Sequence, residues 1–143
     1  MAWFRWLSII ASMLFVLSSD LSAEDKIEFY APVGTDGVQR IELVGGSYFF
    51  HPNKIVVKVN VPVEMRIKKE AGMTPHNFVL KAPEAGLDIR LELTKDPQTV
   101  RFIPKQIGQY TFYCDKKPPL MKSHKDKGMI GDFNRGPLMN SFA

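Results

Sequence analysis

The chain has 143 residues, a formal net charge of +4 and a single cysteine. That length allows one domain and little more, and a lone cysteine rules out a disulfide within the chain. The basic excess is small and is not interleaved with aromatic side chains along one stripe, which argues against nucleic acid as a partner.

The first 23 residues have the character of a secretory signal peptide. Arg5 precedes an apolar run at residues 7–17, and the stretch ends at Ala23, a small residue suited to cleavage. The run is shorter than the roughly 20 residues that a membrane-spanning helix needs, and an uncleaved anchor is the alternative. We therefore expect a periplasmic or otherwise exported protein whose single domain occupies residues 24–143.

From residue 26 onward, apolar and polar side chains alternate with a period of two, which indicates β-strands. The expected strands occupy residues 26–30, 38–44, 47–50, 54–60, 63–69, 76–81, 87–93, 98–103 and 109–114. Turn residues separate them at short intervals. The pattern predicts an all-β fold, a Greek-key β-sandwich or barrel, with a loose tail from about residue 134.

Two of these strands end in side chains that can bind a metal. Cys114 lies on the same face of its strand as Phe112, and His76 lies on the same face as Phe78, because strand side chains alternate. If the phenylalanines face the core, the thiol and the imidazole point inward as well. They can then meet at one end of the sandwich.

His124 and Met129 follow Cys114 along the chain and complete a recognisable set of donors. A thiolate, two imidazoles and a distant thioether are the ligands of a mononuclear blue-copper site. The thiolate and the imidazoles bind both Cu(I) and Cu(II), and the thioether tunes the potential without imposing a square-planar geometry. These four residues therefore predict one bound copper ion.

The sequence resembles the cupredoxins, the plastocyanin-like ones in particular. The resemblance lies in "TPHNFVL" at 74–80, in "YTFYC" at 110–114 and in the spacing from His124 to Met129, and it extends over about residues 47–133. It implies a cupredoxin fold with His76 and Cys114, together with His124, as equatorial ligands. Met129 is then the axial ligand.

The same resemblance gives roles to two further groups. It implies that the backbone amide of Asn77 donates a hydrogen bond to the cysteine sulfur, a contact of the kind that tunes a metal site. It also implies that His124 is the exposed ligand through which the electron leaves.

The sequence departs from the family's pattern in two places. Nine residues, 115–123, separate the cysteine from the second histidine, more than in plastocyanin-like loops. The strand that follows the methionine is expected to be short, covering residues 129–133, before Asn134 and Gly136.

Other interpretations of these residues stay open. Zinc could take the thiolate and the two imidazoles, although structural zinc favours four firm ligands. Met121 is a rival axial ligand that lacks the spacing of Met129 from His124. A hydrolase pair of Cys114 and His124 lacks a recognisable oxyanion hole or orienting group.

The long loop is rich in lysine. A solvated loop is the plain interpretation of such a charge run. The functional interpretation is a docking surface that steers an acidic redox partner, such as a cytochrome or an oxidase. The residues concerned are Lys116, Lys117, Lys122, Lys125 and Lys127.

These features together predict an exported type 1 copper protein that carries one electron between redox partners. We expect no enzymatic activity and no small-molecule substrate. One alternative is a periplasmic copper-binding or delivery protein with the same ligands. Another is a catalytic red- or green-type cupredoxin with an open coordination position, which Met129 would close.

Overall fold

The computed structural model describes residues 28–136, so the predicted signal peptide and residues 137–143 lie outside the described part of the chain. The first five strands are β1 (Glu28–Tyr30), β2 (Gln39–Gly46), β3 (Phe49–His51), β4 (Lys54–Lys58) and β5 (Val63–Lys69). The others are β6 (Asn77–Ala82), β7 (Leu87–Glu92), β8 (Gln98–Phe102), β9 (Gly108–Tyr113) and β10 (Ile130–Gly136), with a short 3₁₀ helix at Pro83–Ala85. The nine strands expected from the alternating pattern are all present, and within residues 28–136 their ends differ from the expected ones by at most two residues. Residues 26–27 of the first expected strand lie outside the described part of the chain.

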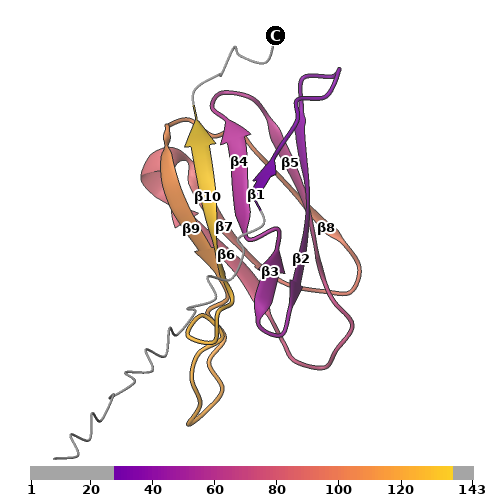
Figure 1. The fold of residues 1–143 in the computed structure, drawn as a ribbon, viewed down its shortest axis with the longest axis vertical. Coiled ribbons are helices and arrows are strands. Elements are labelled where there is room, and N and C mark those ends of the chain that lie inside the picture. The colour runs from indigo at the N-terminus through magenta and orange to yellow at the C-terminus, as the bar shows by residue number, and fades with distance from the viewer. Residues whose placement is uncertain (1–27, 137–143) are drawn as a thin grey trace, which may run out of the picture.

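The strands form two sheets that pack face to face as a β-sandwich (Figure 1). One sheet has six strands in the order β1-β4-β10-β9-β6-β7, and the other has four in the order β3-β2-β5-β8. Both sheets are mixed, because β4 runs parallel to β1 and β10, and β2 runs parallel to β5. The all-β prediction is confirmed. Among residues 28–136, no helix is both long and apolar enough to cross a membrane.

The core lies where the alternating pattern predicts it. In β5 the side chains of Val63, Met65 and Ile67 are buried, whereas the residues between them reach the surface. β4 buries Ile55 and Val57 in the same way. Apolar burial on the inner faces of two sheets is the main stabilising contribution in such a sandwich.

An aromatic cluster fills the core beneath one end of the sandwich. The ring centroid of Phe112 lies 5.3 Å from those of both Phe50 and Phe78, and Phe50 meets Phe78 edge to face. Phe112 and Phe78 point inward, so Cys114 and His76, each two residues away, also point inward. The cluster therefore forms a rigid floor under both side chains.

The final strand corrects two sequence-based expectations. β10 does not stop at residue 133, because it pairs with β9 and β4 as far as Arg135 and Gly136, respectively. Arg135 is buried: its guanidinium lies 3.9 Å from the ring centroid of Tyr110 and donates to the carbonyl of Ala85. A long aliphatic stem and a cation–π contact let an arginine occupy an inward position. The short strand and the loose tail from 134 were therefore wrong for residues 134–136.

The connections at one end of the sandwich carry the potential ligands. The β9–β10 loop projects beyond the sheets at that end, where the β2–β3 and β5–β6 connections also lie (Figure 1). β6 and β9 are neighbours and pair antiparallel, Val79 with Tyr113 and Leu80 with Phe112. This pairing brings the start of β6 next to the end of β9.

Close packing at Gly131 gives a test of this arrangement. A Cβ at this position would overlap the Phe112 ring and lie 2.6 Å from the carbonyl oxygen of Asn53. We expect Gly131→Ala to lower the free energy of unfolding by about 1–3 kcal/mol through overpacking, measured by chemical denaturation. Gly136→Ala in the same strand is the control, because a Cβ there meets nothing within 4 Å. Equal stability of the two variants would contradict the packing.

Candidate metal centre

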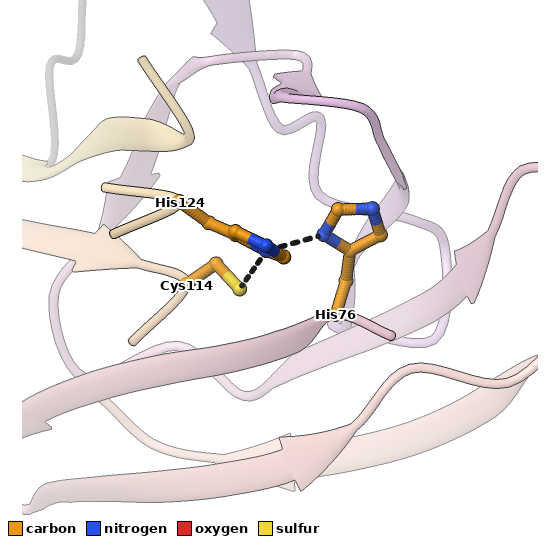
Figure 2. Close-up of side chains that lie close together, drawn as sticks. All are labelled: His76, Cys114 and His124. Atoms are coloured by element: carbon orange, nitrogen blue, oxygen red, sulfur yellow. Dashed lines mark hydrogen bonds between the residues drawn. The ribbon is translucent and has the colours of Figure 1, made fainter. Parts of the chain in front are cut away.

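Three donor side chains converge where β6 begins and β9 ends (Figure 2). His76 immediately precedes β6, Cys114 immediately follows β9, and His124 lies in the connection to β10. Their potential ligand atoms all lie within 4.8 Å of one another. Within residues 28–136, this is the one group of histidine, cysteine and acidic side chains close enough together to hold a metal ion.

The second histidine lies between the other two donors. Its Nδ1 is 3.1 Å from Nδ1 of His76 and 3.5 Å from Sγ of Cys114 (Figure 2). All three side chains are at most 2% exposed. One sulfur and two ring nitrogens facing a common point, without water access, suit a copper ion better than a solvated cation.

Backbone hydrogen bonds hold His124 in place despite the long loop. The amide of His124 donates to the carbonyl of Lys116 at 2.8 Å, which closes the neck of the loop. Residues 117–123 are therefore an excursion outside this neck, with Leu120 fully exposed. Cys114 and His124 therefore lie 3.5 Å apart at their donor atoms although nine residues separate them.

Met129 is tied to the same centre. Its amide donates to the carbonyl of His124 at 3.0 Å, and its carbonyl accepts from the amide of Cys114 at 3.1 Å. The Met129 side chain is fully buried, whereas Met121 is 52% exposed. This difference in burial supports Met129 over Met121 as the axial ligand.

The protonation states fit a site that binds a soft cation. Burial, together with the neighbouring His124 and Lys69, lowers the pKa of His76 to about 4, and burial also lowers the pKa of His124. Both imidazoles are therefore neutral near pH 7 and can donate a lone pair. Burial raises the pKa of the Cys114 thiol despite the amide hydrogen bond from Asn77, so a bound cation must displace the thiol proton.

Two contacts orient the ligands from behind. The Ser47 hydroxyl lies 3.4 Å from Nε2 of His76, which favours a ring with its proton on Nε2 and the lone pair of Nδ1 facing the centre. The amide of Asn77 donates to Sγ of Cys114 at 3.4 Å. The contact that the family resemblance implied for Asn77 is therefore present.

His124 is not the exposed ligand that the resemblance implied. It is 1% exposed, and its Nε2 is buried with no hydrogen-bond partner in the described part of the chain. The ring of Tyr48 lies 4.8 Å from that of His124 and 6.0 Å from that of His76. Lys127 in turn lies over the Tyr48 ring and donates to its hydroxyl at 3.1 Å. These contacts cover the imidazoles.

Three of the five loop lysines contact other side chains of the domain. Lys116 forms an ion pair with Glu92 at 2.8 Å, Lys125 lies over the ring of Tyr113, and Lys127 binds Tyr48. The other two, Lys117 and Lys122, are exposed. The loop therefore presents positive charge at the end of the sandwich that contains the metal centre.

The sequence analysis missed three residues around the centre. Tyr48 was expected only as part of a strand, Arg90 only as part of another, and Asp115 only as a loop charge. In the structure Tyr48 covers the imidazoles, and Arg90 and Asp115 pair beside Cys114. The position of Asp115 next to the cysteine was the only available signal, because Tyr48 approaches from the β2–β3 turn and Arg90 from β7, both remote in the chain.

Comparison with known proteins agrees with this geometry. The family of the cupredoxin-like domain matches residues 7–130. This chain belongs to the cupredoxin-like family. No curated protein matches it by sequence.

Several solved structures share the fold. The metal-binding domain of the Cu(I)-exporting P-type ATPase CopA from Streptococcus pneumoniae D39 has a TM-score of 0.58 and 18% identity, covering 78% of this chain and 97% of that one. Auracyanin from the photosynthetic bacterium Roseiflexus castenholzii has a TM-score of 0.56 and 16% identity, with coverages of 75% and 99%. A heme-copper terminal oxidase has a TM-score of 0.55 and 16% identity, with coverages of 80% and 74%.

The family and the donor geometry together define the centre. This cupredoxin has a type 1-like site for one copper ion, made by His76, Cys114, His124 and Met129. The number of these residues, the soft character of their sulfur and imidazole donors, and their burial all fit a copper ion.

The cover over the imidazoles gives a second test. We expect Tyr48→Ala to speed the loss of Cu(I) from the loaded protein to a strong chelator severalfold, because it removes the ring that packs on His124. Release is followed by the absorbance of the chelator complex.

Two variants serve as controls for this test. Tyr48→Phe keeps the ring and should release copper slowly, and Tyr30→Ala removes a tyrosine that is 68% exposed on β1. If Tyr48→Ala released copper no faster than Tyr30→Ala, the Tyr48 ring would not control access to the centre.

Proposed function

We propose that this cupredoxin is an exported one-electron carrier that passes electrons between redox proteins of the bacterial envelope. The N-terminal sequence and the usual export of cupredoxins support the location. The observation that carries the proposal is the burial of three donor atoms already gathered within 4.8 Å. A site held this firmly changes little between oxidation states, and a small rearrangement favours fast electron transfer.

Different residues of the chain would bind the copper ion, stabilise the thiolate and exclude water. Copper, when bound, supplies a one-electron couple between Cu(II) and Cu(I). Cys114 and the two histidines would hold the ion, and Met129 would supply the weak fourth ligand. The Asn77 amide stabilises the negative charge on the sulfur, and the Phe50, Phe78 and Phe112 cluster keeps water out from below.

The proposal extends to the partner. We infer that the loop lysines steer an acidic surface of a cytochrome or an oxidase toward the metal end of the sandwich. Leu120 and Met121, both exposed at the tip of the loop, would supply the apolar contact. Lys117 and Lys122 have no contact inside the domain comparable to those of Lys116 and Lys127, and are therefore best placed to meet a partner.

In this proposal the protein does not act on a small-molecule substrate. A catalytic copper site needs a coordination position that a substrate or a small anion can enter. The burial of Met129 and the Tyr48 ring packed on His124 support the proposal that no such position is open. A copper-delivery protein with the same ligands is the competing function, and it would require the ion to leave readily.

The first experiment loads the mature protein with one equivalent of Cu(II). We expect an intense thiolate-to-copper absorption band that bleaches with a mild reductant and returns on oxidation without loss of metal. Visible absorption and electron paramagnetic resonance spectra measure these changes. Cys114→Ser should abolish the band, whereas Met121→Leu should retain it. Ready surrender of copper to a strong chelator would instead support delivery, and a colourless product would contradict the blue-copper site.

The docking surface is tested with small charged oxidants. We expect the Cu(I) protein to reduce anionic ferricyanide to ferrocyanide with a rate constant that falls as salt is added, because the loop is positive. Lys122→Glu should slow this reaction and speed the reaction with a cationic cobalt(III) oxidant, measured by stopped flow.

A matched variant separates local steering from net charge. Lys105→Glu makes the same charge change in the connection before β9, at the end of the sandwich remote from Cys114. It should alter both rates less than Lys122→Glu does. Equal effects of the two variants would mean that the electron does not leave near the lysine loop.

A further inference from the structure

A chain of polar contacts leads from the edge of the six-stranded sheet to the sulfur of Cys114. It begins at Arg90 in the middle of β7, the edge strand next to β6. The guanidinium binds the carboxylate of Asp115 with both terminal nitrogens, Nη1 to Oδ2 and, at 3.2 Å, Nη2 to Oδ1. Asp115 is the residue that follows Cys114, so the pair joins β7 to the end of β9.

The next link is a two-point contact between Asp115 and Asn77. The Asn77 side-chain nitrogen donates to Oδ1 of Asp115 at 2.6 Å, and the Asn77 side-chain oxygen accepts from the Asp115 amide at 3.0 Å. Asn77 is fully buried, so these bonds fix its position with little competition from water. Its backbone amide then donates to Sγ of Cys114.

We propose that Arg90 is a positioning residue that raises the reduction potential of the copper centre by acting through Asp115 and Asn77. An amide that donates to the thiolate draws electron density from the sulfur, so the sulfur stabilises Cu(II) less and the reduced state is favoured. Arg90 orients the carboxylate that holds Asn77 and thereby keeps this amide on the sulfur. The inference depends on the copper site and not on the electron-carrier role.

The charge of Arg90 acts in the same direction. Asp115 places a carboxylate directly beside the ligand Cys114, and an uncompensated negative charge there would favour Cu(II) over Cu(I). Arg90 neutralises it in a bidentate pair, the geometry that gives an arginine–carboxylate contact its direction and strength. Loss of Arg90 therefore lowers the potential by both routes.

Lys116 offers a matched comparison within the same site. It lies two residues after Cys114 and pairs with Glu92, also on β7. Its charge acts on Asp115 through space, but no hydrogen bond or ion pair joins its side chain to Asn77 or Asp115. Lys116→Gln and Arg90→Gln thus remove the same charge from the same neighbourhood. Only Arg90→Gln disturbs the chain of contacts to the sulfur.

The test measures two quantities separately: the reduction potential of the copper centre and the rate of hydrogen exchange at the Asn77 amide. Arg90→Gln should shift the equilibrium of the copper protein with a redox mediator severalfold toward the oxidised form, and Lys116→Gln should shift it less. In the metal-free protein, Arg90→Gln should speed hydrogen exchange at the Asn77 amide, measured by nuclear magnetic resonance, whereas Lys116→Gln should not. This second readout still decides the inference if the copper centre fails to cycle reversibly.

Further variants distinguish a specific effect of Arg90 from a general disturbance of β7. Arg90→Lys keeps the charge but cannot bridge two oxygens, so it should fall between the wild type and Arg90→Gln. In an Asp115→Ala background, Arg90→Gln should have no further effect on hydrogen exchange at the Asn77 amide, because Arg90 reaches Asn77 only through the Asp115 carboxylate. Equal shifts for Arg90→Gln and Lys116→Gln with unchanged Asn77 exchange, or an effect of Arg90→Gln on Asn77 exchange that persists without the Asp115 carboxylate, would overturn the proposal.

Discussion

The metal centre depends on backbone hydrogen bonds that join its ligands: the amide of His124 donates to the carbonyl of Lys116, and the carbonyls of His124 and Met129 accept from the amides of Met129 and Cys114. The bond to Lys116 closes the neck of the long loop, so Cys114 and His124 meet although nine residues separate them. Closing a longer flexible loop adds little entropic cost, because that cost grows only with the logarithm of length. The additional residues therefore lie on the surface around the centre, outside the closed neck.

Burial has opposite consequences for the two kinds of ligand. It favours neutral imidazoles, which are ready to bind a metal, and it favours a protonated thiol, which is not. Binding of a cation is thus coupled to release of the proton of Cys114. The amide of Asn77 partly offsets the cost of the buried thiolate, which explains why the contacts that hold this amide matter for the site.

The cover formed by Tyr48 and Lys127 affects electrons and ions differently. An electron can cross a thin layer of packed side chains, whereas a copper ion needs its ligands to open a path. A buried centre with exposed Leu120 and lysines nearby therefore suits contact with a redox partner better than transfer of the metal. In the proposed role, the same cover separates the docking surface from the residues of the metal centre.

The sequence by itself determined nine of the strands, the inward direction of Cys114 and His76, and a set of copper donors in which Met121 remained a rival of Met129, because strand alternation and donor chemistry are local properties. Only the tertiary structure decided that Tyr48 covers His124, that β10 continues past residue 133, and that Arg90 reaches Asp115. Each of these depends on a polar or aromatic side chain that finds its partner in a segment remote in the chain: Tyr48 at His124, Arg135 at Ala85 and Arg90 at Asp115. Alternation of apolar residues carries no information about such pairings, since they are decided only when the sheets assemble.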